Sequence, residues 1–467
     1  MLRPGLRLDG DRLLDPPLQR AIRLGDRDKR LIAALLQRPC TFADIQQIAG
    51  KDAQARLTAL ARLYLLAGPR SDARVALQTE RALLASPTPN VPLRWPDGLR
   101  PPQHGCVGTG TCCSASFLGP IHPAEAAQMM TRDFGRQRRF APGAPRFEIA
   151  QFRGKEVRGM ARDAAGQCVA QGDDSLCEIH LAHGPQAKPL TCRQFPLRLH
   201  QSPDGVHVSL LLACDGYDRS REAAVPWPER EAEIRALLAD GAVALAVHMP
   251  VMLAAGLPIR WTDWQALRAR FLAAEPPTCD PSLWLERVLE LAETAVQQRQ
   301  VALAEGPDIA WSTDLHRLRT GLRAPAGLWP DSVRVQAEAD LRDAAATQAH
   351  PRDRQRLQHL ADGLAALASP LPLTEQAQQH LHDIVTNDLQ VQVILGELDA
   401  GLGNLTRRLL LAHGVAAALA RQSGKVAIDG RDTTQALHVV YRSEAELTWL
   451  GTLHAGAGQV AHASPVP

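Results

Sequence analysis

The sequence predicts a multidomain, mainly α protein with α+β parts. Three observations lead to this prediction. Seven of the nine cysteines lie between Cys106 and Cys214, residues 86–102 hold six prolines, and the chain after residue 229 repeats the apolar spacing of helices. With 467 residues, 45% of them hydrophobic, and a formal net charge of +2, the composition excludes a disordered or collagen-like chain.

Residues 1–85 are expected to form a small module of three short strands followed by three helices. The segment 6–14 alternates around Asp9 and the glycine after it, which is a β-hairpin signal, and residues 21–24 are expected to add the third strand. The helices are expected from about Asp26, from the N-cap Thr41 to Gly50, and over residues 52–66.

This order of elements, over residues 1–68, resembles the small winged-helix modules that are similar to the PqqD-like peptide-recognition fold. The resemblance rests on the pattern of elements and on no signature motif. It implies binding of a leader peptide by strand addition. A structural or dimerising module and a DNA-binding module are the alternatives, and the near-neutral charge balance, without a basic stripe, disfavours nucleic acid as a partner.

The prolines of residues 86–102 exclude a helix or a central strand there, so this stretch is expected to be a semi-rigid linker. Residues 103–220 then form a predicted α+β domain that contains the cysteines. Its expected elements are a helix from Pro123 to about Phe134 and strands near 147–150, 157–160, 167–170, 197–200 and 206–212.

Residues 229–460 are predicted to form an all-helical domain. Asp280 and Pro281 give a helix start, followed by one apolar stripe, and Gly424 with the turn at 428–430 separates the last two helices. The apolar run 242–258 contains His248 and Pro250 and is shorter than the roughly 20 residues of a membrane-spanning helix, so we expect a buried core helix and no membrane partner. The start of the chain has no apolar signal core, so a cytoplasmic location is expected.

The cysteine cluster is the strongest functional signal in the sequence. In a cytoplasmic chain such clustering favours metal or redox chemistry over a disulfide framework, because thiolates are soft anionic ligands for iron, zinc and iron-sulfur clusters. Seven cysteines exceed the needs of one four-ligand centre. The candidate metal ligands are Cys106, Cys112, Cys113, Cys168, Cys177, Cys192 and Cys214.

These residues stand in a recognisable order. They comprise Cys106-Val-Gly-Thr-Gly-Thr-Cys112-Cys113, Gly166-Gln-Cys168, Cys177-Glu-Ile-His180, Lys188-Pro189, Cys192-Arg193-Gln-Phe195-Pro196 and Cys214-Asp-Gly216. The order resembles the zinc- or iron-chelating cysteine-cluster family, which carries a CxxCxxCC opening, a C-x-I-[HY] and [KR]-P-x-x-C-R-x-[FY]-P middle, and a closing cysteine. The family includes the flagellin lysine N-methylase, which transfers methyl groups to protein lysines.

One thiolate of the family pattern is missing, because five residues separate Cys106 from Cys112. Either His104 or His122 supplies the missing ligand, or the metal keeps the open coordination position that catalysis requires. His180 is a further candidate ligand or proton-transfer group. Arg193 is expected to secure the local fold or a cluster sulfide by hydrogen bonding.

The resemblance implies a metal-dependent enzyme that modifies a protein or peptide, with lysine N-methylation as the leading reaction. Its expected cofactor is an iron-sulfur cluster or iron, with zinc as the alternative, and S-adenosylmethionine is the candidate methyl donor, although no motif here identifies the donor. The alternative is a non-catalytic metal-chelating, sensor or assembly protein, because closed metal sites need no turnover.

Overall fold

The computed structural model describes residues 1–98, 101–105, 107–110, 119–132, 145–152, 155–163, 166–214, 216–242, 244–254, 256–303, 315–323, 331–348 and 351–443. These residues form a mainly helical protein with some small sheets, as predicted. Cys106, Cys112 and Cys113 lie outside the described residues.

The N-terminal module, residues 1–85, has the predicted three strands and three helices, followed by a fourth helix that was not predicted. Its elements are β1 (Arg7–Asp9), β2 (Arg12–Asp15), β3 (Arg20–Arg23), α1 (Asp26–Gln37), α2 (Phe42–Ala49), α3 (Ala53–Arg62) and α4 (Pro69–Ala76). The strands form one antiparallel sheet in the order β1-β2-β3. Thr41 accepts a hydrogen bond from the amide of Asp44, which caps α2 as expected. The module has its own hydrophobic core, which includes Leu13, Ile32 and Leu65.

The proline-rich stretch contains only a two-residue strand, β4 (Leu93–Arg94), in its described part. This strand lies at the edge of a four-stranded sheet, where it pairs with β8 in parallel. Trp95 stacks on Trp227 with ring centroids 6.0 Å apart. The stretch is therefore attached to the body of the protein by one edge strand and one aromatic contact.

The cysteine region combines short helices with hairpins. Its elements are α5 (Pro123–Thr131), β5 (Phe147–Phe152), β6 (Lys155–Met160), α6 (Glu178–His183), α7 (Leu190–Gln194), β7 (Leu197–Ser202), β8 (Gly205–Leu210) and α8 (Tyr217–Glu222). The strand predicted at 167–170 is wrong. Cys168 forms only an isolated bridge with Arg162, because the backbone turns immediately afterwards, where Gln171 donates to the carbonyl of Cys168.

The buried helix predicted over residues 242–258 is also wrong. The described part of this run forms the short strands β9 (Ala244–Ala246), β10 (Val251–Met252) and β11 (Pro258–Ile259). Pro250 follows a cis peptide bond and Gly256 has a φ of +79°, and neither conformation fits a helix. The apolar side chains are nevertheless buried, as expected, including Val251, Leu253 and Leu257.

The helical part extends to the end of the described chain. Its helices are α9 (Glu231–Ala239), α10 (Trp261–Ala273), α11 (Pro281–Ala302), α12 (Leu315–Arg323), α13 (Asp331–Thr347), α14 (Pro351–Ala366), α15 (Glu375–Val391), α16 (Leu398–Gln422) and α17 (Gly430–Tyr441). Short 3-10 helices lie at Pro16–Leu18, Gly50–Asp52, Gln78–Leu83, Pro185–Ala187, Trp227–Arg230 and Gln392–Ile394. Asp280 caps α11 as predicted, and the apolar stripe from Leu285 to Val296 is fully buried.

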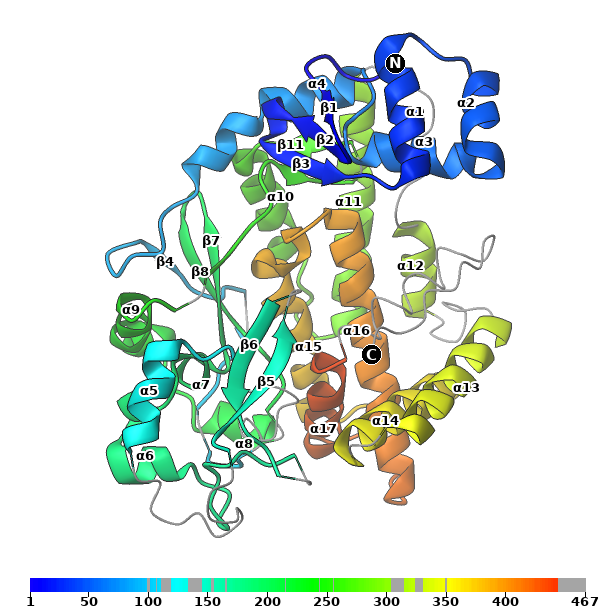
Figure 1. Ribbon diagram of the computed structural model, residues 1–467. Coiled ribbons are helices and arrows are strands. Elements are labelled where there is room, and N and C mark those ends of the chain that lie inside the picture. The colour runs from blue at the N-terminus through cyan, green and yellow to red at the C-terminus, as the bar shows by residue number, and fades with distance from the viewer. Residues whose placement is uncertain are drawn as a thin grey trace.

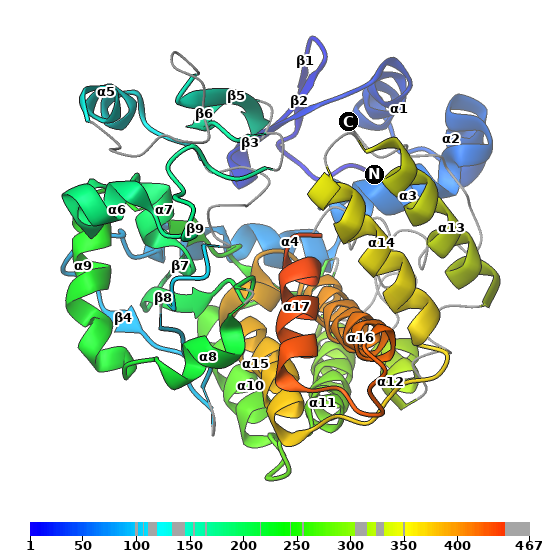
Figure 2. The same ribbon diagram turned by 90° about the horizontal axis from the view of Figure 1, so that it is seen from below.

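Helix α16 lies at the centre of this part, between α14 on one side and α15 on the other (Figures 1 and 2). One continuous hydrophobic core joins these helices to the sheet of β7 and β8. The cysteine region is therefore packed directly on the helical part.

Two glycines let α14 and α16 approach closely. A Cβ added at Gly414 would lie 2.4 Å from the carbonyl oxygen of Gly363, and a Cβ at Gly363 would lie 2.5 Å from Cγ2 of Val415. Because these contacts involve backbone or packed core atoms, neither helix has room for a side chain here.

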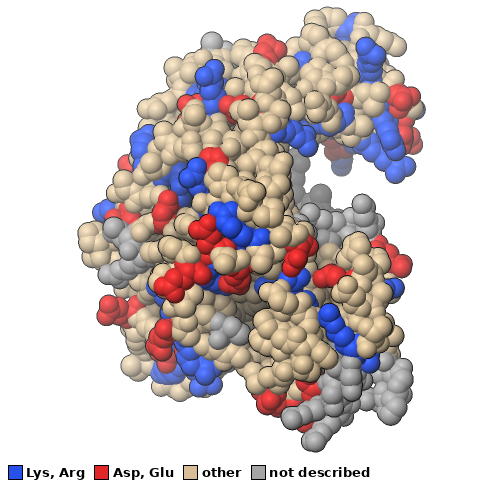
Figure 3. Space-filling view, turned by 90° about the vertical axis from the view of Figure 1, so that its left-hand side faces the viewer, with Lys and Arg blue, Asp and Glu red and all other residues tan. Residues whose placement is uncertain are grey.

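Among the described residues, no helix is both long and apolar enough to cross a bilayer. On the face shown in Figure 3, basic and acidic side chains are interspersed.

We expect Gly414→Ala to lower the free energy of unfolding by about 1–3 kcal/mol, because the new methyl group overpacks the α14–α16 contact. Alanine in an unhindered helix would instead stabilise by up to about 1 kcal/mol. Urea denaturation measures the difference. The control is Gly396→Ala, where a Cβ meets nothing within 4 Å. Equal stability of Gly414→Ala and wild type would contradict the close contact.

Candidate metal centre

All four described cysteines of the cluster line one cavity, which has a volume of about 960 Å³. Cys168 and Cys177 lie in isolated bridges on either side of a turn, Cys192 lies in α7, and Cys214 lies between β8 and α8. The fold thus brings together thiols from four separate segments. Within the described residues, no three His, Cys, Asp or Glu side chains are close enough to one another to hold a metal ion.

The described residues between Cys106 and Cys112, numbers 107–110, line the same cavity. Gly110 has a φ of +71°, and a Cβ there would lie 2.2 Å from the carbonyl oxygen of Ser175. Glycine is therefore required at this position by both conformation and space. The backbone of Gly110 is therefore packed closely against that of Ser175 at the cavity wall.

His104 also lines the cavity, in agreement with its place among the predicted candidates. Its side chain is buried, with 8% of its surface exposed, and its Nε2 has no hydrogen-bond partner among the described residues. Burial lowers the pKa of His104 to about 4, and the charge of Arg230 adds to the shift. The imidazole is therefore neutral at physiological pH, which is the form that binds a metal.

The other candidate histidines lie in different surroundings. His180, on α6, is exposed and lines the cavity. His122 accepts a hydrogen bond from the amide of Ala124 and caps α5, and it lines a neighbouring cavity instead. The structure therefore places His104 and His180, but not His122, beside the described cysteines.

Arg193 lines the cavity while its guanidinium holds the surrounding loops together. Its Nη1 donates to Asp240 at 2.6 Å and to Gln186 at 2.7 Å, and its Nε donates to the carbonyl of Lys188 at 3.2 Å. These bonds fix α7, which carries Cys192, against the turn before it and the end of α9.

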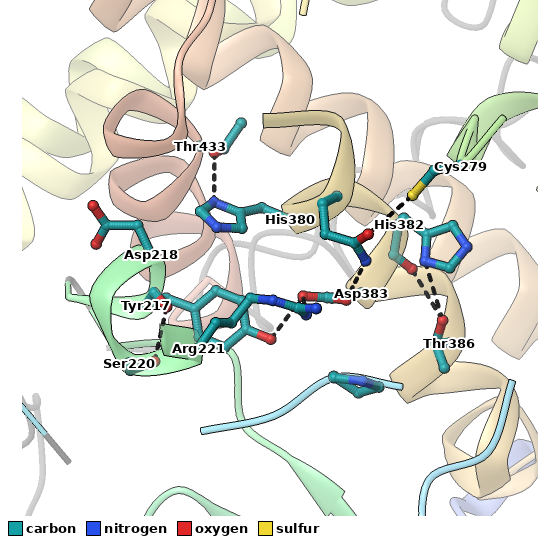
Figure 4. Close-up of polar contacts among 12 residues, drawn as sticks. Tyr217, Asp218, Ser220, Arg221, Cys279, His380, His382, Asp383, Thr386 and Thr433 are labelled. Carbon is teal, nitrogen blue, oxygen red and sulfur yellow. Dashed lines mark hydrogen bonds and ion pairs between the residues drawn. The ribbon is translucent and has the colours of Figure 1, made fainter. Parts of the chain in front are cut away.

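A buried polar network holds the segment that contains Cys214 (Figure 4). Tyr217 donates from its hydroxyl to Oδ2 of Asp383 at 2.9 Å, and Arg221 forms an ion pair with the same carboxylate. Gln379 donates to the second carboxylate oxygen at 3.1 Å. Burial raises the pKa of Tyr217 well above its usual value, so the hydroxyl keeps its proton. Helix α8, which follows Cys214, is thereby bound to α15.

Helix α17 contributes two further contacts to this segment. His438 lies 2.7 Å from the carbonyl oxygen of Ala213, and the amide of Asp218 donates to Thr434 at 3.2 Å. Sequence reasoning did not identify Asp383, Tyr217 or His438. The signal available was the unusual number of polar residues in a helix that is buried from His380 to Val391.

A second cavity, of about 1170 Å³, adjoins the first. The two cavities share four lining residues, Thr191, Phe195, Pro196 and Leu211, which form a common wall. A molecule in the second cavity would therefore be separated from the cysteine cavity by a single layer of side chains.

Comparison with protein-family models, curated proteins and solved structures finds no match for this chain. The assignment of the site rests on its residues and their arrangement.

We expect Tyr217→Phe to lower the free energy of unfolding by about 1–3 kcal/mol, because it removes a donor from the buried carboxylate of Asp383. Urea denaturation measures the loss. The control is Asp218→Asn on the same helix, whose side chain points away from the network (Figure 4) and should leave stability within about 0.5 kcal/mol of wild type. A Tyr217→Phe variant as stable as Asp218→Asn would show that the network does not anchor α8.

His380 makes the free energy of unfolding depend on pH. Burial, with a further contribution from Arg221, lowers its pKa to about 4, whereas the unfolded chain has a histidine pKa of about 6.5. Between these values the unfolded state binds more protons, so this contribution to stability is complete above about pH 6.5 and is lost as the pH falls toward 4. The loss is about 1.4 kcal/mol per pH unit for each such histidine.

His380→Gln should therefore show a shallower fall in unfolding free energy between pH 7 and pH 5 than wild type. Urea denaturation at several pH values measures the slope. Thr433→Val is the control, because it removes the 3.0 Å partner of His380 but keeps the imidazole. It should lower stability and retain the wild-type slope. Parallel curves for wild type and His380→Gln would contradict the assignment.

Proposed function

We propose that the cavity lined by Cys168, Cys177, Cys192 and Cys214 holds a metal centre, and that the protein is a metal-dependent enzyme that modifies a protein or peptide. The observation that carries the proposal is the convergence of four thiols from separate segments on one cavity. The motif resemblance makes lysine N-methylation the leading reaction and supports iron or an iron-sulfur cluster over zinc.

The side chains that line the cavity are of the kinds that such a centre uses. Four thiols, and His104, whose Nε2 has no hydrogen-bond partner among the described residues, are the soft and borderline ligands that iron and zinc prefer. Basic side chains outnumber acidic ones in the lining, with Lys188, Arg193, Arg230 and Arg442 against Glu233. This balance offsets the negative charge that several thiolates bring into one cavity.

When bound, a metal centre would supply Lewis-acid or redox chemistry to a molecule in the cavity. The protein's own residues would supply the surroundings. Removal from water in the cavity disfavours the charged form of an amine that enters, which favours its neutral, nucleophilic form.

The neighbouring cavity favours an enzyme over a closed chelating site. Closed structural sites surround a metal fully with protein, whereas catalytic sites leave space for a second molecule. Here the cysteine cavity of about 960 Å³ exceeds the space of a single ion, and a second cavity lies across one wall.

The first test is metal and acid-labile sulfide analysis, with an absorption spectrum, of protein purified without oxygen. Cys192→Ser should lose most of the bound metal, because each thiolate contributes strongly to affinity. The matched control is Cys40→Ser in the N-terminal module, which should keep wild-type metal content. Wild-type protein without metal, or equal metal in both variants, would refute the metal centre.

Turnover is tested separately. Metal-loaded protein is incubated with labelled S-adenosylmethionine and a pool of native proteins under anaerobic conditions. Label transfer to protein lysine that is lost in Cys192→Ser and kept in Cys40→Ser supports the methylation reaction. Bound metal without transfer would instead support a chelating, sensor or assembly role.

A further inference from the structure

The second cavity is lined by charged side chains as well as apolar ones. It lies between α5, the β5–β6 hairpin, strand β7 and the first turn of α16. Most of its lining is apolar, with Ile121, Leu190, Val393 and Leu395 among the side chains. None of the cluster cysteines in the described part of the chain lines it. Whatever binds here is therefore not held by the thiols.

The buried end of this cavity holds two arginines. Arg408 forms an ion pair with Asp388, and both residues are almost fully buried. Arg198 donates at 2.7 Å to the neutral amide of Gln392 and has no carboxylate ion-pair partner among the described residues. The two guanidinium groups lie over the ring of Tyr441, with centroid distances of 4.8 Å for Arg408 and 5.9 Å for Arg198. Within the described part of the chain, the charge of Arg198 thus has no negative counterpart.

A neighbouring histidine provides a second, independent sign of an absent ligand. His200 lines the same cavity and is fully buried. Its Nε2 lies 3.0 Å from Oγ of Ser209, but its Nδ1 has no hydrogen-bond partner in the described ranges. Buried polar atoms without partners are rare in folded proteins and point to a missing ligand or water.

The remaining carboxylates of the lining are those of Glu125, Glu156 and Glu397. Glu125 accepts from the amides of Leu190 at 2.8 Å and His122 at 3.2 Å, and Glu156 is exposed on β6. Glu397 is the N-cap residue of α16. The N-terminal end of this 25-residue helix faces the cavity, and its dipole favours negative charge.

We propose that the second cavity binds a small organic carboxylate, with its carboxylate group between Arg198 and Arg408 and its apolar part against the hydrophobic lining. The fork of a guanidinium matches a carboxylate in geometry and charge. A cationic ligand would instead place a second positive charge beside Arg198. This proposal does not depend on the metal centre, because Arg198 and Arg408 line the second cavity and not the cysteine cavity.

The test is isothermal titration of the full-length protein with octanoate, octylammonium and acetate. Octanoate should bind at one site per chain, octylammonium should not bind there, and acetate should bind at least about tenfold more weakly because it lacks the apolar part. Saturable octylammonium binding as tight as that of octanoate, or no saturable octanoate binding, would overturn the proposal.

Variants locate the site. Arg198→Met should weaken octanoate binding by about tenfold or more, because it removes a charge-assisted hydrogen bond, while Arg198→Lys should retain part of the affinity. Arg431→Met is the control, because Arg431 is exposed on α17 and lines neither cavity. It should bind octanoate within about twofold of wild type. Unchanged octanoate affinity in Arg198→Met with a wild-type melting temperature would place the ligand elsewhere.

Discussion

Two buried carboxylates on α15, Asp383 and Asp388, connect the helical part to the segments that line the two cavities. They lie five positions apart, so on a helix of 3.6 residues per turn they face different directions. Asp383 binds Tyr217 and Arg221 behind the segment of Cys214. Asp388 pairs with Arg408 at the end of the second cavity.

A buried charge that loses its partner costs about 3–5 kcal/mol, so these two pairs tolerate little rearrangement. Asn387 lies between them in sequence and accepts a hydrogen bond from the amide of Leu210, at the end of β8, at 2.6 Å. Three polar residues of α15 thus hold three other elements. Asp383 holds α8, Asn387 holds the end of β8, and Asp388 holds α16. The cysteine region, which has small sheets and short helices, is anchored to α15 by the contacts of Asp383 and Asn387.

The sequence predicted the elements that local signals specify. Asp9 with its glycine, the cap at Thr41 and the start at Asp280 act within a few residues, and the structure has the expected elements at each. The helix predicted over 242–258 was wrong because apolar residues indicate burial and do not by themselves indicate a helical period. The cis peptide bond before Pro250 also has no signal in the local sequence. The strand expected at 167–170 was wrong because the backbone turns directly after Cys168.

Only part of the candidate site could be predicted from the sequence. Clustering of the cysteines indicated metal ligation, with more candidate ligands than one centre needs, and the four described members line one cavity. The residues that position them, such as Asp383 and Arg193, act through contacts across long stretches of chain. The second cavity is formed by segments from residue 120 to residue 408, and no short motif could have indicated it.

The common wall of Thr191, Phe195, Pro196 and Leu211 has a thermodynamic consequence for the whole molecule. A side chain that faces both cavities adopts one rotamer at a time, so a change of its rotamer alters the shape of both cavities. A molecule that shifts this wall on one side changes the affinity of the other side, and linkage requires the effect to be equal in both directions. Occupants of the two cavities would in this way be coupled to the extent that each of them moves the wall.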